Sequence, residues 1–135
     1  MTPEGAVIKA CLEYLEIKGI FAWRNNSGAL WDKNNRLVRF GKKGSADILG
    51  ILPDGIFLAV ECKGGHNKPT DDQKMFLENI EKNGGCVILA RSVEDLEKGL
   101  QQFYSLQSSS MAEQGIPHPF FPQHAGSIPA SANRQ

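Results

Sequence analysis

An apolar segment with a turn signal in its middle, residues 44–64, constrains the fold of this chain most. It reads GSADILGILPDGIFLAVECKG, and the Pro-Asp-Gly sequence at 53–55 divides it into two apolar runs. Apolar runs on either side of such a turn predict two strands of a hairpin with at least one buried face. Asp47, Glu61 and Lys63 lie within these runs, and charged side chains are rarely buried without a partner. We therefore expect these three charged side chains to have partners or a function.

The length of the turn decides whether the two carboxylates meet. With a three-residue loop, Leu52 pairs with Ile56, and the same register places Asp47 opposite Glu61. A two-residue loop or a bulge would change this pairing, and a shift by one residue moves the carboxylates to opposite faces. In the three-residue register the two carboxylates would lie about 5 Å apart, as directly opposite residues do. At that distance they would repel each other by roughly 3 kcal/mol at an effective dielectric of about 20. We therefore expect a compensating cation between them.

Lys63 supplies part of that compensation, because it lies two residues after Glu61 and so on the same face of the strand. A divalent ion can supply the rest, since two carboxylates, a main-chain carbonyl and waters form an oxygen site suited to Mg²⁺ or Mn²⁺. Such an ion, beside a lysine, is typical of phosphodiester hydrolysis. The spacing alone also allows a charged cluster at the end of a hairpin that serves only solubility.

The pattern along the rest of the chain predicts helices and strands around this hairpin. Thr2 and Pro3 begin a helix, and Thr70 with Gln73 forms a capping box before another. We expect an α/β fold with the core order α-β-β-β-α-β-α and a mixed central sheet flanked by helices. The expected elements are a helix at 3–18, a strand at 19–24, a small basic hairpin within 30–40, the hairpin 44–64, a helix at 71–83, a strand at 86–90 and a helix up to 104.

The chain divides into a domain and a tail. Residues 1–104 hold the predicted elements, and 135 residues of ordinary globular composition suit one domain. Residues 105–135 are poor in charge, rich in Pro, Ser and Gln and without periodicity, so we predict an irregular or disordered tail.

Charge is unevenly distributed although the formal net charge is zero. Between Lys18 and Lys43 the chain carries seven basic residues against the single acid Asp32. A basic segment of this kind favours a polyanion such as DNA, although a solvated hairpin explains it as well. The predicted DNA-binding residues are Arg24, Arg36, Arg39, Lys42 and Lys43.

The cysteines and the hydropathy favour a cytoplasmic protein. Cys11, Cys62 and Cys86 lie in apolar surroundings without CxxC spacing, which is typical of small buried residues in a reducing compartment. No secretory signal and no apolar run of about 18 residues is visible. We therefore expect a soluble, cytoplasmic protein with no membrane partner.

The ordered motifs resemble a known nuclease family. Asp47, a turn and then Glu61-Cys62-Lys63 resemble the D…(D/E)xK signature of the PD-(D/E)XK nuclease superfamily, and the predicted order is similar to its restriction-endonuclease-like core. More narrowly, the motifs resemble those of the VRR-NUC family over about residues 3–100. The matching segments are 44–50, 60–64, Gln73 and 85–90, with Glu4 early in the first helix.

The resemblance implies roles for particular residues. Asp47 and Glu61 would bind Mg²⁺ or Mn²⁺, together with the main-chain carbonyl of Cys62, and Lys63 would be catalytic. Glu4 and Gln73 would be further members of the site. Both have structural explanations as well, because an acid in a first helical turn favours the helix dipole and the capping box accounts for Gln73. Ala46 stands where the name of the superfamily has Pro.

The resemblance also implies a function: a metal-dependent endodeoxyribonuclease. Short stand-alone members of the family tend to form homodimers, are often carried by phages, and cut branched DNA such as four-way junctions. The alternative is a non-catalytic DNA-binding module or accessory subunit that retains the nuclease fold. Nucleotide hydrolysis is less well supported, because residues 41–45 (GKKGS) lack the spacing of a phosphate-binding loop.

Overall fold

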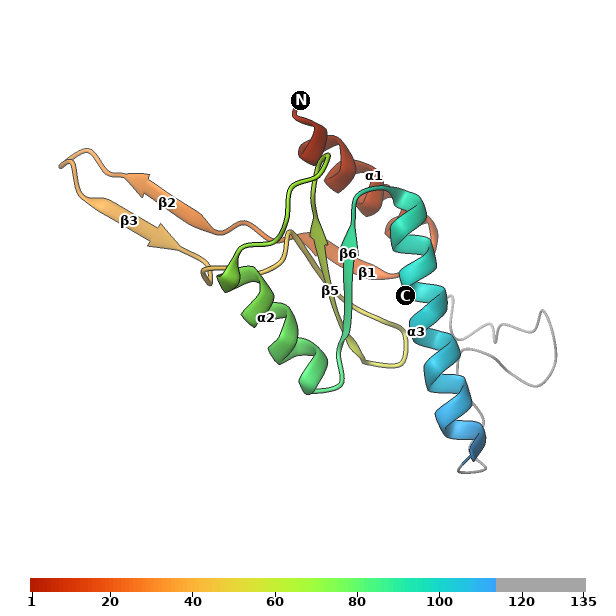
Figure 1. The fold of residues 1–135 in the computed structure, drawn as a ribbon. Helices are drawn as coiled ribbons and strands as arrows, with labels where there is room; N and C mark the ends of the chain where they lie inside the picture. Colours follow the sequence, from red (N-terminus) through yellow and green to blue (C-terminus); the bar gives the residue numbers. More distant parts are fainter. Residues whose placement is uncertain (114–135) are drawn as a thin grey trace.

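A four-stranded mixed sheet in the order β1-β4-β5-β6 forms the centre of the fold in the computed structural model, which describes residues 1–113 (Figure 1). Neighbouring strands run antiparallel except for the parallel pair β5 and β6. The predicted mixed α/β architecture is confirmed. The strands are β1 (Phe21–Arg24), β4 (Ile48–Ile51), β5 (Phe57–Cys62) and β6 (Cys86–Ala90).

The predicted hairpin of residues 44–64 forms with the three-residue loop. The main-chain nitrogen of Leu52 donates to the carbonyl of Ile56 at 2.8 Å, and Ile48 pairs with Val60. Gly55 adopts a φ of 88°, in the left-handed region that glycine reaches without a Cβ clash. The turn chemistry therefore sets the register of β4 against β5.

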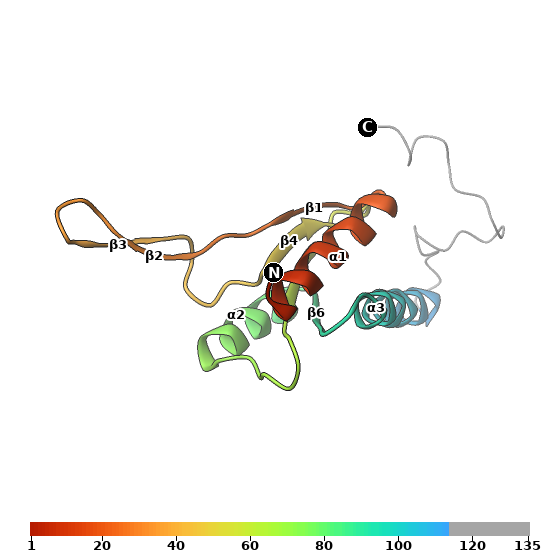
Figure 2. The same ribbon diagram turned by 90° about the horizontal axis from the view of Figure 1, so that it is seen from above.

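Three helices cover the sheet, with α1 (Pro3–Ile17) and α3 (Val93–Glu113) on one face and α2 (Asp71–Lys82) on the other (Figure 2). Thr2 Oγ1 caps α1 by accepting from the nitrogen of Gly5, and both bonds of the predicted capping box open α2. The core lies between the sheet and the pair α1 and α3. Its buried members include Ile8, Cys11, Leu15, Ile48, Leu58, Val60, Cys62, Cys86, Ile88, Leu96 and Leu100. All three cysteines are buried thiols, as predicted.

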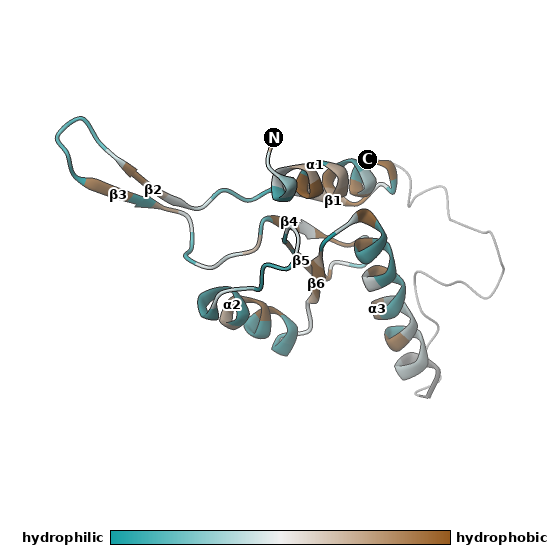
Figure 3. Ribbon diagram, turned by 45° about the horizontal axis from the view of Figure 1, so that its top comes forward, coloured by the Kyte–Doolittle hydropathy of each residue, from teal (hydrophilic) through white to brown (hydrophobic). Residues whose placement is uncertain are grey.

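A separate two-stranded ribbon extends from the body of the molecule (Figures 1 and 2). It consists of β2 (Gly28–Trp31) and β3 (Leu37–Phe40), and its antiparallel pairing confirms the predicted small hairpin. Every residue of the two strands is exposed, although most of these residues are apolar, as the brown segments of β2 and β3 show (Figure 3). We call residues 28–40 the ribbon.

The last helix is longer than predicted. It continues to Glu113, so the prediction of irregular structure from residue 105 is wrong for residues 105–113. No Gly or Pro stands in that stretch to end the helix. The rest of the predicted tail, residues 114–135, lies outside the described residues. Within residues 1–113 no helix has both the length and the apolar character needed to cross a membrane.

Candidate metal and active site

The two hairpin carboxylates lie side by side on the face of the sheet opposite the core. The observed register, in which Ile48 pairs with Val60, puts Asp47 immediately before β4 and across from Glu61 in β5. Asp47 Oδ2 accepts a hydrogen bond of 2.8 Å from the main-chain nitrogen of Cys62. Asp47 is partly buried, whereas Glu61 is only 1% exposed. The predicted meeting of the two acids is thus present.

Lys63 lies against the buried acid. Its Nζ is 3.4 Å from Glu61 Oε2, and the two side chains are 10% and 1% exposed. Within residues 1–113, neither carboxylate oxygen of Glu61 has a hydrogen-bond partner. Burying an ionised carboxylate is costly unless it is paired and hydrogen-bonded, so one ammonium at this distance compensates Glu61 incompletely.

The protonation of Glu61 reflects this environment. Burial, first, and the nearby charge of Asp47, second, raise the pKa of Glu61 from 4.5 to about 7, while Lys63 acts in the opposite direction. A carboxyl group whose pKa is raised by desolvation and by a nearby like charge is a candidate member of a functional site. A cation bound by both carboxylates would favour the ionised form of Glu61.

The oxygen atoms present fit a small, hard divalent cation. The part of the chain that the structure describes contains no cluster of three or more His, Cys, Asp or Glu side chains able to hold a metal. An ion here would therefore rely on the carboxylates of Asp47 and Glu61, main-chain oxygen and waters, which is the usual ligand set of Mg²⁺. The unpartnered oxygens of Glu61 are what such an ion would satisfy.

The main-chain carbonyl of Cys62 can join that set. In a strand, the N–H and C=O of one residue point to the same side. The Cys62 nitrogen points to Asp47, whereas the nitrogen of Lys63 donates to Ala90 of β6 on the other side. We therefore expect the carbonyl of Cys62 on the Asp47 side. The thiol of Cys62 points away into the core, where its hydrogen bond with Cys11 and its burial raise the pKa of Cys62.

Asn25 holds the segment before Asp47, a role that the sequence does not reveal. Its side-chain nitrogen donates to Ser45 Oγ at 2.6 Å and to the carbonyl of Ala46 at 2.9 Å. Its main-chain nitrogen donates to the carbonyl of Asp47 at 2.8 Å. Bonds across about 20 residues leave no local signal in the sequence.

The two remaining predicted site residues occupy helix starts beside the hairpin. Glu4 lies in the first turn of α1, where its main-chain nitrogen is 3.2 Å from a Cβ built on Gly64. Gln73 Oε1 accepts from the nitrogen of Thr70 at 2.9 Å, which is the capping bond. Among residues 1–113, no hydrogen bond joins Gln73 to Asp47, Glu61 or Lys63. The structure therefore accounts for Gln73 as a cap, and its role at the site stays a prediction.

The structure does not bring the predicted DNA-binding residues together on one face. Arg24 pairs with Ile48 and so lies on the core face, where it lines a cavity beside α1. Arg36 and Arg39 lie on the ribbon, with Arg36 bound to Asp32 at 3.2 Å. Lys42 and Lys43 follow at the base of the ribbon, and Lys43 Nζ is 3.3 Å from Asp72 Oδ2.

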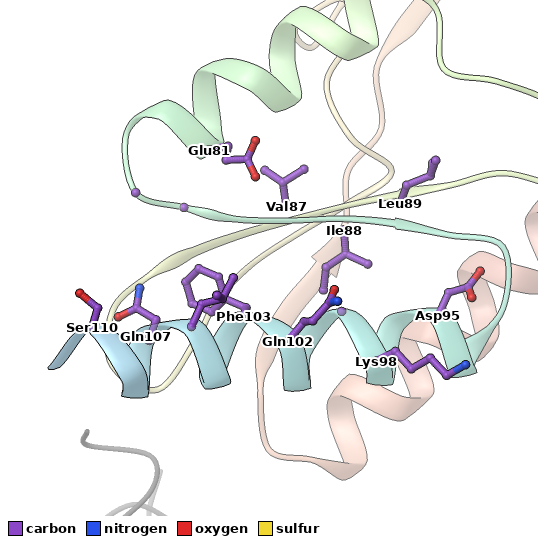
Figure 4. A pocket seen from close by; sticks show the side chains of 14 residues that line it. Glu81, Val87, Ile88, Leu89, Asp95, Lys98, Gln102, Phe103, Gln107 and Ser110 are labelled. Carbon is purple, nitrogen blue, oxygen red and sulfur yellow. The ribbon is translucent and has the colours of Figure 1, made fainter. Parts of the chain in front are cut away.

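A groove of about 890 Å³ lies elsewhere, between the end of α2, β6 and α3 (Figure 4). Val87 and Leu89 point to one side of β6, and Ile88 points to the other, toward α3 (Figure 4). None of the predicted site residues lines it. The groove is therefore separate from the carboxylates.

The sequence matches no family model and no curated protein. Solved structures with a similar fold do exist, and one of them is a VRR_NUC domain with 28% sequence identity and a TM-score of 0.58. The match covers 77% of this chain and 100% of that domain. The likeness supports a nuclease-type function, and it agrees with the order of elements and the motifs on the hairpin. This chain is therefore similar to a VRR_NUC domain in both fold and sequence, as its motifs predicted.

Proposed function

We propose that this protein is a Mg²⁺- or Mn²⁺-dependent endodeoxyribonuclease that binds DNA and hydrolyses its phosphodiester bonds. The observation that carries the proposal is the arrangement of Asp47, Glu61 and Lys63. Two carboxylates face each other across β4 and β5, both oxygens of Glu61 lack a hydrogen-bond partner within residues 1–113, and one lysine contacts the pair.

The two carboxylates and the lysine have different roles in the proposed reaction. Asp47, Glu61 and the carbonyl of Cys62 would hold the divalent ion, which when bound would supply Lewis acidity to the reaction. Lys63 Nζ lies at the same carboxylate and orients the attacking water or stabilises the charge that develops on the phosphate. The bond from Cys62 N to Asp47 Oδ2 fixes the position of one carboxylate in advance.

The preferred substrate that we propose is branched DNA, such as a four-way junction, cut by a homodimer. One site of this kind cuts one strand, so paired incisions across a junction need two sites at a fixed separation. The exposed Arg39 and Lys42, near the base of the ribbon, can bind phosphates, a sequence-independent interaction that weakens with salt. A cytoplasmic location stays a prediction.

A non-catalytic DNA-binding module is the alternative with the same fold. DNA binding alone does not require the Glu61 carboxylate, which is 1% exposed, faces Asp47 and lacks hydrogen-bond partners among residues 1–113. Replacing such a charged cluster with apolar residues is often neutral or stabilising. The retained charges therefore favour the enzyme.

The test is cleavage of a labelled four-way junction and of its linear arms in Mg²⁺, Mn²⁺ or EDTA. Glu61→Gln keeps the shape of the side chain and removes its charge, and Glu78→Gln makes the same change at an exposed position on α2. We expect the wild type and Glu78→Gln to cut, and no cutting in EDTA or by Glu61→Gln. Light scattering of the same samples measures the oligomeric state.

The possible outcomes separate the parts of the proposal. Equal cutting of arms and junction would retain the site and discard the preference for branched DNA. A cutting protein that is monomeric with DNA bound would discard the homodimer. Salt-sensitive binding without cutting in either metal would replace the nuclease by the non-catalytic module.

A further inference from the structure

The ribbon presents two different faces. Antiparallel pairing places Ala29 opposite Arg39 and Trp31 opposite Leu37, and side chains alternate along each strand. One face therefore carries Trp31, Leu37 and Arg39. The other carries only Gly28, Leu30, Val38 and Phe40, with the Phe40 ring 3.4 Å from a Cβ built on Gly28. An indole and a guanidinium thus share one face of two strands whose other residues are apolar or glycine.

The Trp31 side chain is unusually accessible for its size. Trp31 is 69% exposed, and no ring contact or cation–π contact to it occurs within residues 1–113. A contiguous group of exposed apolar side chains marks an interaction site, and in the ribbon Trp31 is joined by the exposed Leu30, Leu37, Val38 and Phe40. Leu30, on the other face, is exposed to a similar degree, 65%, and provides an internal comparison.

The charge of the ribbon selects a polyanion as the partner of this face. Residues 28–40 contain Lys33, Arg36 and Arg39 against the single acid Asp32. A second ribbon of the same charge would repel this one, whereas a nucleic acid offers phosphates to Arg39 and flat base surfaces to Trp31. Base stacking on an aromatic side chain tolerates any sequence, because every base has a π face.

The base of the ribbon is fixed next to the proposed metal site. Asn25 binds both Ser45 and the carbonyl of Ala46, and its main-chain nitrogen binds the carbonyl of Asp47. A Cβ built on Gly41 lies only 2.7 Å from Ser27 Cβ, so the two strands approach closely where they leave the body. DNA held by the ribbon is therefore held at a defined place relative to Asp47.

We propose that Trp31 stacks on a base pair left uncovered at a DNA branch point while Arg39 contacts an adjacent phosphate, so that the ribbon makes this protein select branched DNA. The inference deepens the proposed function and rests on it. A side chain that inserts into a continuous duplex must unstack two neighbouring base pairs, which costs free energy. At a branch point the stacking of the base pairs is already interrupted or more easily opened, so that cost is lower. Trp31 therefore distinguishes the two forms without reading sequence.

The first test measures fluorescence of Trp31 itself. Trp23→Phe leaves Trp31 as the one tryptophan of the chain, and Glu61→Gln in the same protein prevents cutting. Stacking on a base quenches indole emission. We expect quenching on addition of a four-way junction and little change with relaxed circular duplex, which has no ends. Equal quenching by both DNAs, or none with bound junction, would overturn the inference.

The second test compares the two faces of the ribbon by junction affinity in the Glu61→Gln background. Trp31→Ala should weaken junction binding by about tenfold and circular duplex binding much less, because the stacking contact with the base is lost. Trp31→Phe should retain most of the affinity. Leu30→Ala, on the opposite face, should retain it as well.

The outcomes distinguish the inference from its alternatives. An equal loss with Leu30→Ala and Trp31→Ala would overturn stacking by one face. If Trp31→Ala converts a dimer to a monomer, the ribbon contacts a second copy of the chain and not DNA, and the inference is wrong. If Glu61→Gln abolishes cutting while Trp31→Ala leaves the ratio of junction to duplex cutting unchanged, the nuclease stands and the inference fails. If the wild type cuts no DNA, the nuclease fails while the fluorescence test still decides the role of Trp31.

Discussion

Asp47 Oδ2 accepts a 2.8 Å hydrogen bond from the main-chain nitrogen of Cys62, the residue between Glu61 and Lys63. This bond connects the carboxylate before β4 to the strand that carries the other two charged groups. Asp47 is therefore oriented before any cation binds, and the nitrogen of a fully buried residue is satisfied. Asp47 therefore has a structural role, as the acceptor for Cys62 N, and a proposed role as a metal ligand. Substitutions at Asp47 can separate these two roles.

The first prediction contrasts Asp47→Asn with Asp47→Ala. The asparagine oxygen can still accept from Cys62 N, whereas alanine leaves a buried N–H without a partner, which costs about 1–3 kcal/mol. We expect Asp47→Ala to unfold at lower urea concentration and Asp47→Asn to be at least as stable as the wild type, because the repulsion with Glu61 is removed. Both should lose Mg²⁺ binding in calorimetry. Equal stability of the two variants would contradict the structural role of the bond.

The second prediction concerns pH. The folded state holds the Glu61 proton more tightly than the unfolded state, since burial and Asp47 raise its pKa from 4.5 to about 7. Between these values, the folded protein retains a proton that the unfolded chain has released. The metal-free protein should therefore lose stability as pH rises through this window, by about 3 kcal/mol in total, because each pKa unit corresponds to about 1.4 kcal/mol.

Glu61→Gln isolates this contribution. Its free energy of unfolding relative to the wild type, measured in EDTA by urea denaturation at pH 4.5, 6 and 8, should increase with pH. Glu78→Gln, at an exposed position, corrects for the loss of one carboxylate. Saturating Mg²⁺ should reduce the difference at pH 8, because an ion bound to the wild type stabilises its ionised form. A difference independent of pH would rule out a buried, proton-retaining Glu61.

Local chemistry explains why the sequence predicts the site hairpin in its correct register. Pro53-Asp54-Gly55 marks the loop, and glycine reaches a φ of 88° without a Cβ clash, so the three-residue loop is one of the two registers that the local sequence allows. The facing of Asp47 and Glu61 follows by counting. The capping box of Thr70 with Gln73 is equally local and was predicted in the same way.

Features set by distant contacts could not be predicted. The face on which Arg24 lies depends on the pairing of β1 with β4, and no turn connects those strands directly. The bonds of Asn25 to Ser45 and Ala46 depend on the same pairing. The length of α3 was missed for a different reason: the serines after Tyr104 are weaker helix formers that also suit turns, although good helix formers such as Leu106 and Gln107 lie among them.

The third prediction separates the capping role of Gln73 from a role at the site. Gln73→Ala removes the acceptor for Thr70 N and should reduce stability by about 0.5–2 kcal/mol. Gln73→Glu keeps an acceptor at the same position and should preserve stability, as glutamate also completes a capping box. Thermal unfolding measures both. Loss of cleavage in Gln73→Glu at unchanged stability would give the side chain a role in the reaction, whereas retained cleavage would leave it as a cap.

The fourth prediction uses two glycines with similar backbones and different surroundings. Gly44 and Gly55 have φ values of 80° and 88°, so alanine at either position incurs a similar left-handed strain, about 1–2 kcal/mol. A Cβ at Gly44 would lie 2.6 Å from the carbonyl oxygen of Asp72 in α2, whereas a Cβ at Gly55 has no atom within 4 Å.

Gly44→Ala should therefore be less stable than Gly55→Ala, by about 1–3 kcal/mol, the usual cost of overpacking. The clash must push the loop before Asp47 away from the start of α2, so cleavage and Mg²⁺ affinity should fall in Gly44→Ala and persist in Gly55→Ala. Urea denaturation and calorimetry on the two variants measure these differences. Equal stability losses would mean that α2 moves freely relative to the loop, and equal Mg²⁺ affinities would mean that the position of Asp47 does not depend on α2.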